Sequence, residues 1–453
     1  MYINKSKIIL NIKKLDKTYF SKSKNLTGSI IVPGDKSISQ RALIIGLIST
    51  GKTVIEDILD SEDVYHTLKA IESLGALVNK KKDLIEINGI GVGNLKTPEK
   101  PIYMGNSGTG TRLLLGLVAG SNALVTFYGD QSLSNRPMER VISPLEDMGA
   151  TIICSKDKKL PITIKGARAK GFIMPINFNL LIPSAQVKSA IIFAALSGRG
   201  TSSITEYKKT RNYTEAMLKS RGVAIKIKKI KNKSITLIDG TSLVEAKSIK
   251  IPGDPSSAAF LAVAAIITKN SSICIENILH DKFRLNIFSV LKKMGAKIKI
   301  IKTNEDKCKI IVKSSNLKNI YLSDNKSSAL IDEYPILSIA AACARGYSKM
   351  EGLGELRFKE SNRFDAIIDG LNKSGVEVKS VKDKIIIKGS KKIKGGCIID
   401  ANNDHRIAMC FNILSLVSEE PILIKGNKTI MTSYPNFFNS LISLGANSSV
   451  YDG

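Results

Sequence analysis

Four arginines occupy equivalent places in this sequence, at or just before the start of a segment whose apolar residues have helical spacing. They are Arg136, Arg211, Arg284 and Arg363. An arginine opposes the dipole at a helix N-terminus, so a carboxylate or phosphate partner is needed beside it. Four such arginines predict a strongly anionic ligand that is bound between two domains.

Polar residues also precede six segments that are apolar nearly all round. These helix starts lie at 35–37, 106–109, 184–186, 254–257, 332–333 and 404–406. The N-terminus of a buried helix presents free N–H groups and a positive dipole end, which together suit an anion. Because Ser, Thr, Asn and Asp are also the common N-caps, each start alone is equally explained as a cap, and the set from Asp254 to Ser257 is expected to be nothing more.

The six apolar segments themselves are rich in Ala and Gly. They lie at 42–49, 112–120, 189–198, 257–267, 336–346 and 407–416. A helix that is apolar on every side is buried in a large protein, and small residues let it pack closely against its neighbours. The sequence therefore predicts six fully buried helices.

A second kind of helix ends six times in a glycine that is followed by a short β-prone run. Successive glycines are 70 to 80 residues apart, at Gly75, Gly149, Gly222, Gly295, Gly375 and Gly445. Apolar residues at helical spacing precede each of them, as Phe364 and Ile367 precede Gly375. Each glycine is therefore predicted to be the left-handed C-terminal cap of an amphipathic helix. Each repeat then contains a buried helix, a turn, a strand, an amphipathic helix and a second strand.

Two similar Pro-Gly breaks, at 31–37 and 249–257, divide the six repeats into three and three. Pro-Gly inside a β-prone run marks a change of chain direction, so the chain is expected to cross between domains there. The expected N-terminal domain is 34–252. The expected C-terminal domain is 1–33 plus 253–453, with the active site in the cleft between the two domains. The fold class is α/β.

Length and composition agree with two large domains, because 453 residues with 43% apolar content exceed one ordinary core. The longest apolar runs, such as Ala258 to Thr268, are shorter than the roughly 20 residues of a membrane span. The apolar stretch from Ile8 to Leu10 is too short for a signal peptide. A cytoplasmic protein that does not contact membranes is expected.

The six cysteines are scattered, without a CxxC pair or a histidine at metal-ligand spacing. Reduced thiols and no metal site are therefore expected. The net charge of +28 suits nucleic acid, an anionic membrane or small anionic substrates. Lysine is abundant throughout the chain, however, and there is neither a Trp nor an aromatic stripe that would bind single-stranded nucleic acid. A solvated lysine-rich surface and no nucleic-acid partner are expected.

Seven blocks of the sequence resemble the successive signature blocks of EPSP synthases, in the same order and over nearly the whole chain. They are 34–43, 105–116, 129–150, 183–191, 331–337, 355–367 and 403–411. The forms GDKSIS and SAQVKSA are similar to the bacterial class II branch. The resemblance implies a two-domain enolpyruvyl transferase fold, in which each domain has three βαβαββ repeats around buried parallel helices.

The resemblance also implies a reaction. The enolpyruvyl group of phosphoenolpyruvate (the donor) would be transferred to the 5-hydroxyl of shikimate 3-phosphate (the acceptor), with release of inorganic phosphate. This is a step of the shikimate pathway, which leads to chorismate and the aromatic amino acids. The resemblance implies a monomer without a cofactor or a metal.

Residue by residue, the resemblance implies a set of site residues. Those implied to hold the acceptor are Lys36, Ser37, Arg41, Ser184, Ala185, Gln186, Arg211, Asp332 and Lys359. Those implied to hold the donor are Lys36, Gly108, Arg136, Gln186, Arg363, His405 and Arg406. For catalysis, Asp332 is expected to take the hydroxyl proton and Glu360 to protonate the donor's methylene carbon, and Lys36 is expected to share in proton transfer.

The sequence departs from the family pattern at two places in this site. Asn362 stands where many members have Asp, next to Arg363. Around Thr432 and Ser433 the chain lacks a lysine that many members use against phosphoenolpyruvate. The orientation of Arg363 and one donor contact are therefore expected to differ.

Several of these residues have simpler alternative explanations. Glu360 and Arg363 are one helical turn apart, which suits a surface ion pair, and Asp332 suits a helix cap. His405 could be a packed neutral histidine. Arg284 lies outside the seven blocks and is expected to be a surface residue.

The sequence leaves two alternative functions open. The first is the sister enolpyruvyl transferase that acts on UDP-N-acetylglucosamine, but its usual cysteine before an Arg-Pro motif is absent from 129–135. The second is a basic nucleic-acid-binding protein of the same architecture, which would show salt-dependent retention on nucleic acid and no release of phosphate.

Overall fold

The computed structural model describes residues 15–81, 84–240 and 243–451, which form two compact units. Of these residues, those between 36 and 251 form the N-terminal unit, and 15–35 with 252–451 form the C-terminal unit. The sequence had placed the corresponding boundaries at residues 34 and 252.

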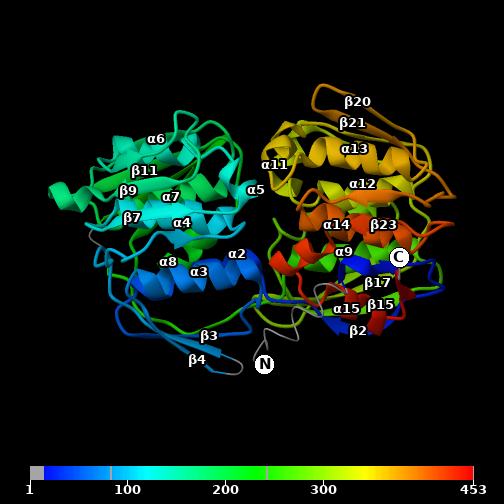
Figure 1. The fold of residues 1–453 in the computed structure, drawn as a ribbon, viewed down its shortest axis with the longest axis horizontal. Helices are drawn as coiled ribbons and strands as arrows, with labels where there is room; N and C mark the ends of the chain where they lie inside the picture. Colours follow the sequence, from blue (N-terminus) through cyan, green and yellow to red (C-terminus); the bar gives the residue numbers. More distant parts are fainter. Residues whose placement is uncertain (1–14, 82–83, 241–242, 452–453) are drawn as a thin grey trace. The chain divides into compact units, whose positions relative to one another are not determined.

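Three four-stranded sheets form the strand layers of the N-terminal unit (Figure 1). The first sheet has the order β14 (Ile249–Lys250), β3 (Lys52–Glu56), β5 (Leu84–Asn88) and β4 (Leu77–Lys80). The second has the order β6 (Ile102–Tyr103), β7 (Leu124–Tyr128), β9 (Ile162–Lys165) and β8 (Thr151–Ile153). The third has the order β10 (Asn177–Leu180), β11 (Thr201–Glu206), β13 (Lys233–Asp239) and β12 (Ile225–Ile230).

The C-terminal unit has two further sheets of four strands and two ladders of two strands. One four-stranded sheet has the order β16 (Lys297–Lys302), β17 (Lys307–Lys313), β15 (Ser272–Leu279) and β2 (Thr27–Ile31). The other has the order β18 (Tyr321–Leu322), β19 (Tyr347–Met350), β21 (Lys384–Lys388) and β20 (Val378–Val381). The two-stranded ladders pair β22 (Ile398–Asp400) with β23 (Leu423–Lys425), and β1 (Thr18–Phe20) with β24 (Ser448–Val450).

Each four-stranded sheet combines one parallel pair with two antiparallel pairs. For example, β6 pairs in parallel with β7, which pairs antiparallel with β9, and β9 forms a hairpin with β8. In two sheets the parallel partner comes from far along the chain. Thr27 of β2 lies opposite Ser272 of β15, and Ile249 of β14 lies opposite Ile55 of β3. The residues before the first Pro-Gly break therefore complete a sheet of the C-terminal unit.

Six buried helices form where the apolar segments predicted them, and this prediction is confirmed. They are α2 (Lys36–Ile48), α4 (Gly108–Ala119), α7 (Ala185–Ala195), α9 (Pro255–Ile267), α12 (Tyr334–Ala342) and α14 (His405–Ser415). Gly116 shows why small residues are needed, since a Cβ there would lie 2.1 Å from the carbonyl oxygen of Ala190. Helices α4 and α7 approach too closely for a side chain at that point.

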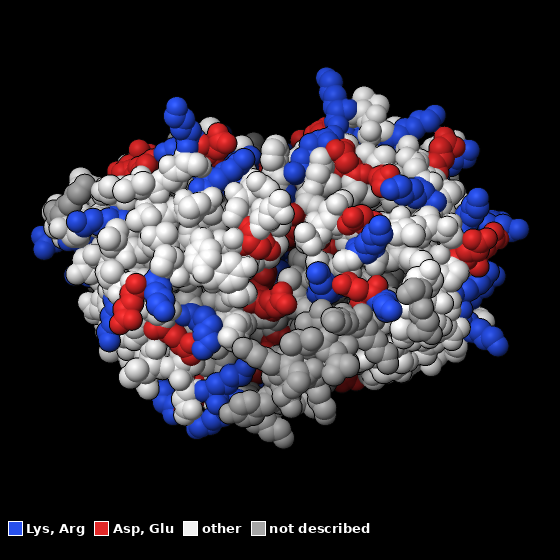
Figure 2. Space-filling view, viewed as in Figure 1, with Lys and Arg blue, Asp and Glu red and all other residues white. Residues whose placement is uncertain are grey.

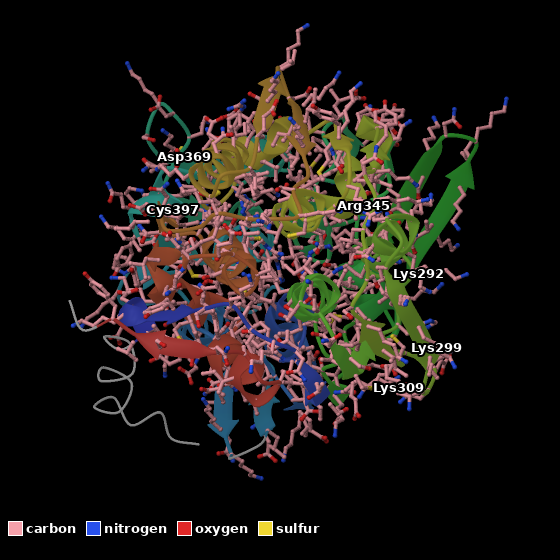
Figure 3. The ribbon with its side chains drawn as sticks, turned by 90° about the vertical axis from the view of Figure 1, so that its right-hand side faces the viewer. Lys292, Lys299, Lys309, Arg345, Asp369 and Cys397 are labelled. Atoms are coloured by element: carbon pink, nitrogen blue, oxygen red, sulfur yellow. The ribbon has the colours of Figure 1, made fainter. Side chains whose placement is uncertain are left out.

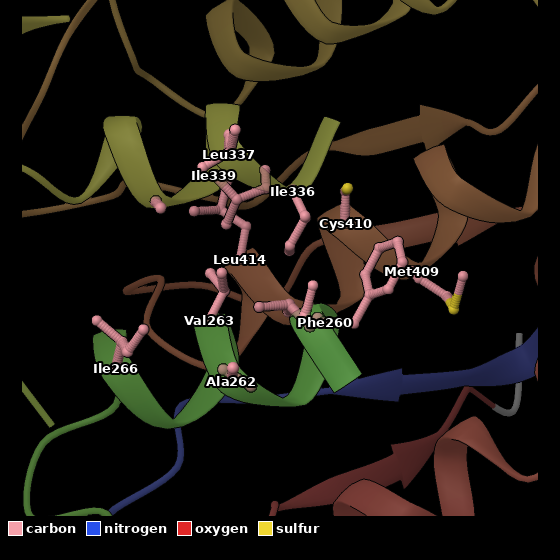
Figure 4. Packing of buried hydrophobic residues seen from close by; sticks show 14 of the residues in the cluster. Phe260, Ala262, Val263, Ile266, Ile336, Leu337, Ile339, Met409, Cys410 and Leu414 are labelled. Atoms are coloured by element: carbon pink, nitrogen blue, oxygen red, sulfur yellow. The ribbon is translucent and has the colours of Figure 1, made fainter. Parts of the chain in front are cut away.

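In the C-terminal unit, the buried helices share one apolar core. Figure 4 shows Phe260 and Val263 of α9 facing Ile336 of α12 and Leu414 of α14. Each of these side chains is at most 1% exposed. Burial of this size, at roughly 1.5–3 kcal/mol for each large apolar side chain, holds the three helix starts of the unit in fixed positions.

Six amphipathic helices follow the buried ones in the repeats. They are α3 (Glu62–Ser73), α6 (Glu139–Asp147), α8 (Tyr213–Lys219), α10 (Asn286–Lys293), α13 (Arg363–Lys373) and α15 (Phe437–Ser443). The six repeat glycines that follow them have φ between 84° and 111°. The predicted left-handed caps are therefore confirmed. Short helical segments lie between these elements, at α5 (Gln131–Ser134), α11 (Ser327–Leu330), 167–170, 324–326, 354–358 and 427–432.

Within each unit, Figure 2 shows Lys and Arg side chains scattered over the visible face rather than gathered in one stripe. Figure 3 places Lys292, Lys299 and Lys309 along one side of the C-terminal unit. Among the described residues, no helix is long and apolar enough to cross a membrane. All six cysteines are free, and burial raises the pKa of Cys308 to about 11 and that of Cys343 to about 12.

Candidate active site

In the N-terminal unit, the first cluster of predicted residues lies at the start of α2. The Lys36 Nζ is 3.0 Å from the Asp63 carboxylate, which belongs to the first turn of α3, and the Lys36 side chain is 17% exposed. Arg41 is buried and donates to the Ser37 carbonyl at 2.9 Å. Asp63 therefore fixes the position of Lys36, which remains partly exposed to solvent. Arg41 instead hydrogen-bonds to the backbone of the first turn of α2.

Gln186 joins the starts of α4 and α7. Its Oε1 accepts a hydrogen bond from Arg112 at 2.8 Å, and its Nε2 donates to Thr109 at 2.8 Å. Ser184 caps α7 by accepting the N–H of Val187 at 3.3 Å, and Ala185 begins the helix. Gln186 is thus oriented by α4, which carries the donor residue implied at Gly108.

Arg136 lies against the same helix start. Its guanidinium donates to the side chain and to the carbonyl of Asn106, and it lies 3.3 Å from Ser132 Oγ. A Cβ on Gly108 would be 2.7 Å from Arg136 Nη1 and 3.1 Å from Arg112 Nη1. Glycine therefore leaves the room in which two guanidinium groups meet.

Arg211 lies in the loop 207–212 between β11 and α8, where its side chain is half-buried. Its place in the acceptor site remains a proposal.

In the C-terminal unit, four charged residues meet at the start of α13. Arg363 is 1% exposed and lies 2.7 Å from Asp404 and 2.6 Å from Glu360. Its Nη1 is 3.8 Å from the Asp332 carboxylate. The buried position of Arg363 rules out the simple surface ion pair that its spacing from Glu360 allowed.

Asp332 and α14 complete this cluster. The Asp332 carboxylate is 4.0 Å from Lys359 Nζ, and its backbone carbonyl accepts a hydrogen bond from Arg406 at 2.8 Å. His405 is only 3% exposed, and its Nδ1 lies 3.3 Å from Thr432 Oγ1. The structure thus brings together Asp332, Lys359, Glu360, Arg363 and Arg406, whereas the described contact of the buried His405 is with Thr432.

The environment shifts the pKa of two cations in opposite directions. Desolvation lowers the pKa of Lys359, and the neighbouring Arg363 lowers it further against the effect of Asp332. Desolvation also opposes the charge on Arg363, but Asp404 and Glu360 outweigh it and raise its pKa above the usual value. Arg363 is a permanent cation, and Lys359 releases its proton more readily than an ordinary lysine.

The expectation that Arg284 is a surface residue is wrong. Arg284 is 5% exposed and lies 2.7 Å from Asp35 and 2.6 Å from Asp254. The anionic partners that its helix-start position requires are thus two carboxylates of the protein. Asp254 also caps α9 by accepting the N–H of Ser256, so it is more than the cap that was expected.

The two departures from the family pattern have local effects. The Asn362 side chain caps α13 by accepting the N–H of Asp365 at 3.2 Å, and it donates to the Asp365 carboxylate at 2.6 Å. The orientation of Arg363 comes from Asp404 instead. Near the missing lysine, Thr432 contacts His405.

Sequence reasoning missed Asp63 and Arg112, and it noted Asp404 only as part of a helix start. A signal existed for each of the first two. Asp63 is a first-turn acid of an amphipathic helix, and Arg112 is one turn after Gly108 on the same face of α4. Their partners, Lys36 and Gln186, come from other repeats, and no spacing in the sequence indicates such a contact.

The described residues contain no group of three or more His, Cys, Asp or Glu that could hold a metal ion. They do contain two clusters rich in Arg and Lys, and the cluster around Arg363 holds the carboxylates of Asp332, Glu360 and Asp404. Forked guanidinium groups suit a carboxylate or a phosphate, and carboxylates beside them suit proton transfer.

Comparison with known proteins gives one consistent result. The family model described as EPSP synthase (3-phosphoshikimate 1-carboxyvinyltransferase) matches residues 20–441. A 3-phosphoshikimate 1-carboxyvinyltransferase of Parvibaculum lavamentivorans is 41% identical over 428 residues, which cover 93% of this chain and 94% of that protein. The enzyme of the same name from Bartonella quintana is 42% identical over 94% of this chain and 97% of that protein.

Solved structures agree with these relatives. An EPSP synthase from Acinetobacter baumannii has a TM-score of 0.82 and 36% sequence identity, and the match covers 96% of this chain and 99% of that one. The enolpyruvyl transferase NikO from Streptomyces tendae has a TM-score of 0.73 at 14% identity, over 95% of this chain and 98% of that one, which shows a shared fold. The two-domain enolpyruvyl transferase fold implied by the sequence is confirmed.

Proposed function

This chain belongs to the EPSP synthase family, whose curated members are named 3-phosphoshikimate 1-carboxyvinyltransferase, and we propose that it transfers the enolpyruvyl group of phosphoenolpyruvate to the 5-hydroxyl of shikimate 3-phosphate. The observation that carries the mechanism is the meeting of Asp332, Glu360 and Lys359 around the buried Arg363. This cluster combines two carboxylates with cations that suit anionic substrates.

The chemistry proceeds by addition and then elimination. The donor's methylene carbon gains a proton while the acceptor's 5-hydroxyl oxygen bonds to the adjacent carbon and loses its proton. The tetrahedral intermediate then loses a methyl proton, and its carbon–oxygen bond to phosphate breaks. Inorganic phosphate leaves, and the enol double bond forms again on the acceptor.

We assign the two proton transfers to different carboxylates. Asp332 takes the hydroxyl proton, and the neighbouring Lys359 cation favours the ionised carboxylate that this role needs. Glu360 delivers the proton to the methylene carbon. In the described structure Glu360 is paired with Arg363, and a donor anion that binds Arg363 would compete for the same guanidinium. Donor binding would therefore free Glu360 to take up a proton.

The proposed roles draw on both units. Lys36, Gly108, Arg136 and Gln186 belong to the N-terminal unit, whereas Arg363 and Arg406 belong to the C-terminal unit. Among the described residues, the partners of the Arg136 guanidinium are Asn106 and Ser132 and include no carboxylate, so its charge is available to an anionic substrate. We propose that turnover requires residues of both units, and that the chain acts as a cytoplasmic monomer.

Release of inorganic phosphate tests this function. The purified protein should release phosphate when shikimate 3-phosphate and phosphoenolpyruvate are both present, and neither substrate alone should give it. Replacing shikimate 3-phosphate by UDP-N-acetylglucosamine should abolish the release. Release with the sugar nucleotide but not with shikimate 3-phosphate would refute the proposal, and so would release from phosphoenolpyruvate alone.

A further inference from the structure

Lys188 is a charged residue near the start of a buried helix. It lies on α7, its side chain is 1% exposed, and the helix around it is buried from Val187 to Ala195. Its Nζ lies 2.8 Å from Glu206 and 2.7 Å from Glu215, whose side chains are 5% and 3% exposed. These three residues form a buried ion cluster, hereafter the Lys188 cluster, that no role assigned above uses.

The two glutamates of the Lys188 cluster lie on either side of one loop. Glu206 is the last residue of β11, and Glu215 is in the first turn of α8. The loop between these elements, 207–212, carries Arg211. Within it, buried Thr210 donates a hydrogen bond of 2.5 Å from Oγ1 to the Glu206 carboxylate. Lys188 therefore holds both ends of the loop, and Thr210 ties its middle to the same cluster.

A second set of contacts joins this region to α2. Ser189, the residue after Lys188, lies 2.7 Å from Thr214 and accepts a hydrogen bond from Arg41 at 3.1 Å. Thr214 in turn accepts one from Arg41 Nε at 2.8 Å. Adjacent residues of α7 thus fix Arg41 and the loop that carries Arg211. Both arginines are implied to bind shikimate 3-phosphate.

Stabilisation of the fold alone does not explain a lysine at position 188. Burying one ammonium and two carboxylates has a large desolvation cost, and apolar replacements of similar volume are often neutral or stabilising. What an apolar side chain cannot supply is a directional link between β11 and α8.

We propose that Lys188 is a positioning residue, which fixes the loop 207–212 so that Arg211 meets the 3-phosphate of the acceptor. This inference rests on the proposed function. It makes the Lys188 cluster a determinant of specificity for a phosphorylated acceptor rather than a part of the proton-transfer machinery.

The test compares two acceptors, shikimate 3-phosphate and shikimate, which lacks the phosphate. A triple variant, Lys188→Met with Glu206→Gln and Glu215→Gln, removes the charges together, so that no carboxylate is left buried without its cation. We expect its KM for shikimate 3-phosphate to rise about tenfold to a hundredfold, the range for a charge-assisted hydrogen bond. The kcat at saturation and the kcat/KM for shikimate should change little. The single variant Lys188→Arg keeps the positive charge beside both glutamates, so its KM for shikimate 3-phosphate should rise less than that of the triple variant.

A second variant keeps the proposal testable if the triple variant does not fold. Thr210→Val removes only the hydroxyl that ties the loop to Glu206, and it should also raise the KM for shikimate 3-phosphate selectively. Its control is Thr53→Val, because the Thr53 hydroxyl is buried and has no hydrogen-bond partner among the described residues. That variant should behave like the parent.

Additivity gives the last comparison. In an Arg211→Ala background the triple variant should have no further effect on the KM, because the two changes act through one contact. Equal losses for both acceptors, full additivity or an unchanged KM would each overturn the inference. A parent protein that shows no turnover with shikimate 3-phosphate and phosphoenolpyruvate would instead overturn the proposed function.

Discussion

The Asp404 carboxylate holds the Arg363 guanidinium through two hydrogen bonds, at 2.7 Å from Nε and 3.2 Å from Nη2. The same carboxylate accepts the N–H of Arg406 at 2.9 Å and so caps α14. One buried carboxylate thus sets the positions of Arg363 and Arg406, the two arginines of the C-terminal unit that we propose to bind phosphoenolpyruvate. The capping sites of this fold are therefore also the supports of its proposed active site.

Asp404→Asn should separate these two tasks. The amide oxygen can still cap α14, but the amide cannot hold the guanidinium of Arg363 through two charge-assisted bonds. We expect the free energy of unfolding to fall by about 1–3 kcal/mol and donor binding to weaken strongly. Chemical denaturation and calorimetry with phosphoenolpyruvate measure the two effects.

A matched control for Asp404→Asn is Asp369→Asn on the same helix as Arg363. Asp369 forms an exposed pair with Lys373, and Figure 3 shows it at the surface. Such pairs contribute about 0–1 kcal/mol, so this variant should bind the donor like the parent. A similar loss of donor affinity in both variants would contradict the support role of Asp404.

Gly108→Ala should impair the donor site without unfolding the protein. The added Cβ would lie 2.7 Å from Arg136 Nη1, and a guanidinium at the end of a side chain can move away. A displacement of about 1 Å can reduce catalysis up to roughly a hundredfold, so the kcat/KM for phosphoenolpyruvate should fall while acceptor binding persists. Gly116→Ala is the contrasting variant, since its Cβ would meet the Ala190 backbone and should destabilise the unit by about 1–3 kcal/mol or more. Equal donor kinetics for parent and Gly108→Ala would refute this view of the site.

The two carboxylates should differ in an exchange experiment. Glu360→Gln should nearly abolish the incorporation of solvent deuterium into the donor's methylene group, because the proton donor is gone. Asp332→Asn should leave Glu360 in place but weaken acceptor binding and slow attack. Each variant should lose about a hundredfold or more in turnover. Exchange at the parent rate in Glu360→Gln, with exchange lost in Asp332→Asn, would reverse the assigned roles.

The pH profile should reflect the lowered pKa of Lys359. The Lys359 cation attracts the anionic shikimate 3-phosphate. This attraction is present at a pH below the pKa of Lys359 and is lost as the pH rises through that pKa. Because the pKa lies below 10.5, the kcat/KM for shikimate 3-phosphate should begin to fall at a lower pH than an ordinary lysine would give. The charged groups that act on Lys359 are Asp332, Arg363, Glu360 and Glu355. Lys359→Arg should move the alkaline fall to higher pH, and an unmoved profile would exclude Lys359 as its origin.

Much of the fold could be predicted because each repeat encodes it locally. The cap glycines, such as Gly375, and the apolar helices, such as residues 257–267, are set by backbone geometry and burial, which leave a direct pattern in the sequence. The same local logic led to the wrong expectation for Arg284. Its partners Asp35 and Asp254 lie in the two Pro-Gly segments, which are far apart in the sequence. The contact of Arg284 with both carboxylates therefore depends on how these distant segments pair.

The site was predictable only in part for the same reason. Residues at helix starts, such as Lys36 and Arg363, stand out because their charge conflicts with the helix dipole. The side chains that orient them, Asp63 and Asp404, look like ordinary first-turn or capping acids. Lys188 lies in the segment 183–191, which resembles the family, yet nothing in its spacing indicates that Glu206 and Glu215 surround it.

The central claim is that an enolpyruvyl group is transferred, and the fate of one oxygen atom tests it most directly. Phosphoenolpyruvate can be labelled with heavy oxygen at the position that bridges carbon and phosphorus. Enolpyruvyl transfer breaks the carbon–oxygen bond, so the label should appear in inorganic phosphate, in equal amount to the enolpyruvylshikimate phosphate formed. A phosphoryl transfer or a simple phosphatase would break the phosphorus–oxygen bond and leave the label in pyruvate, and that result would contradict the account.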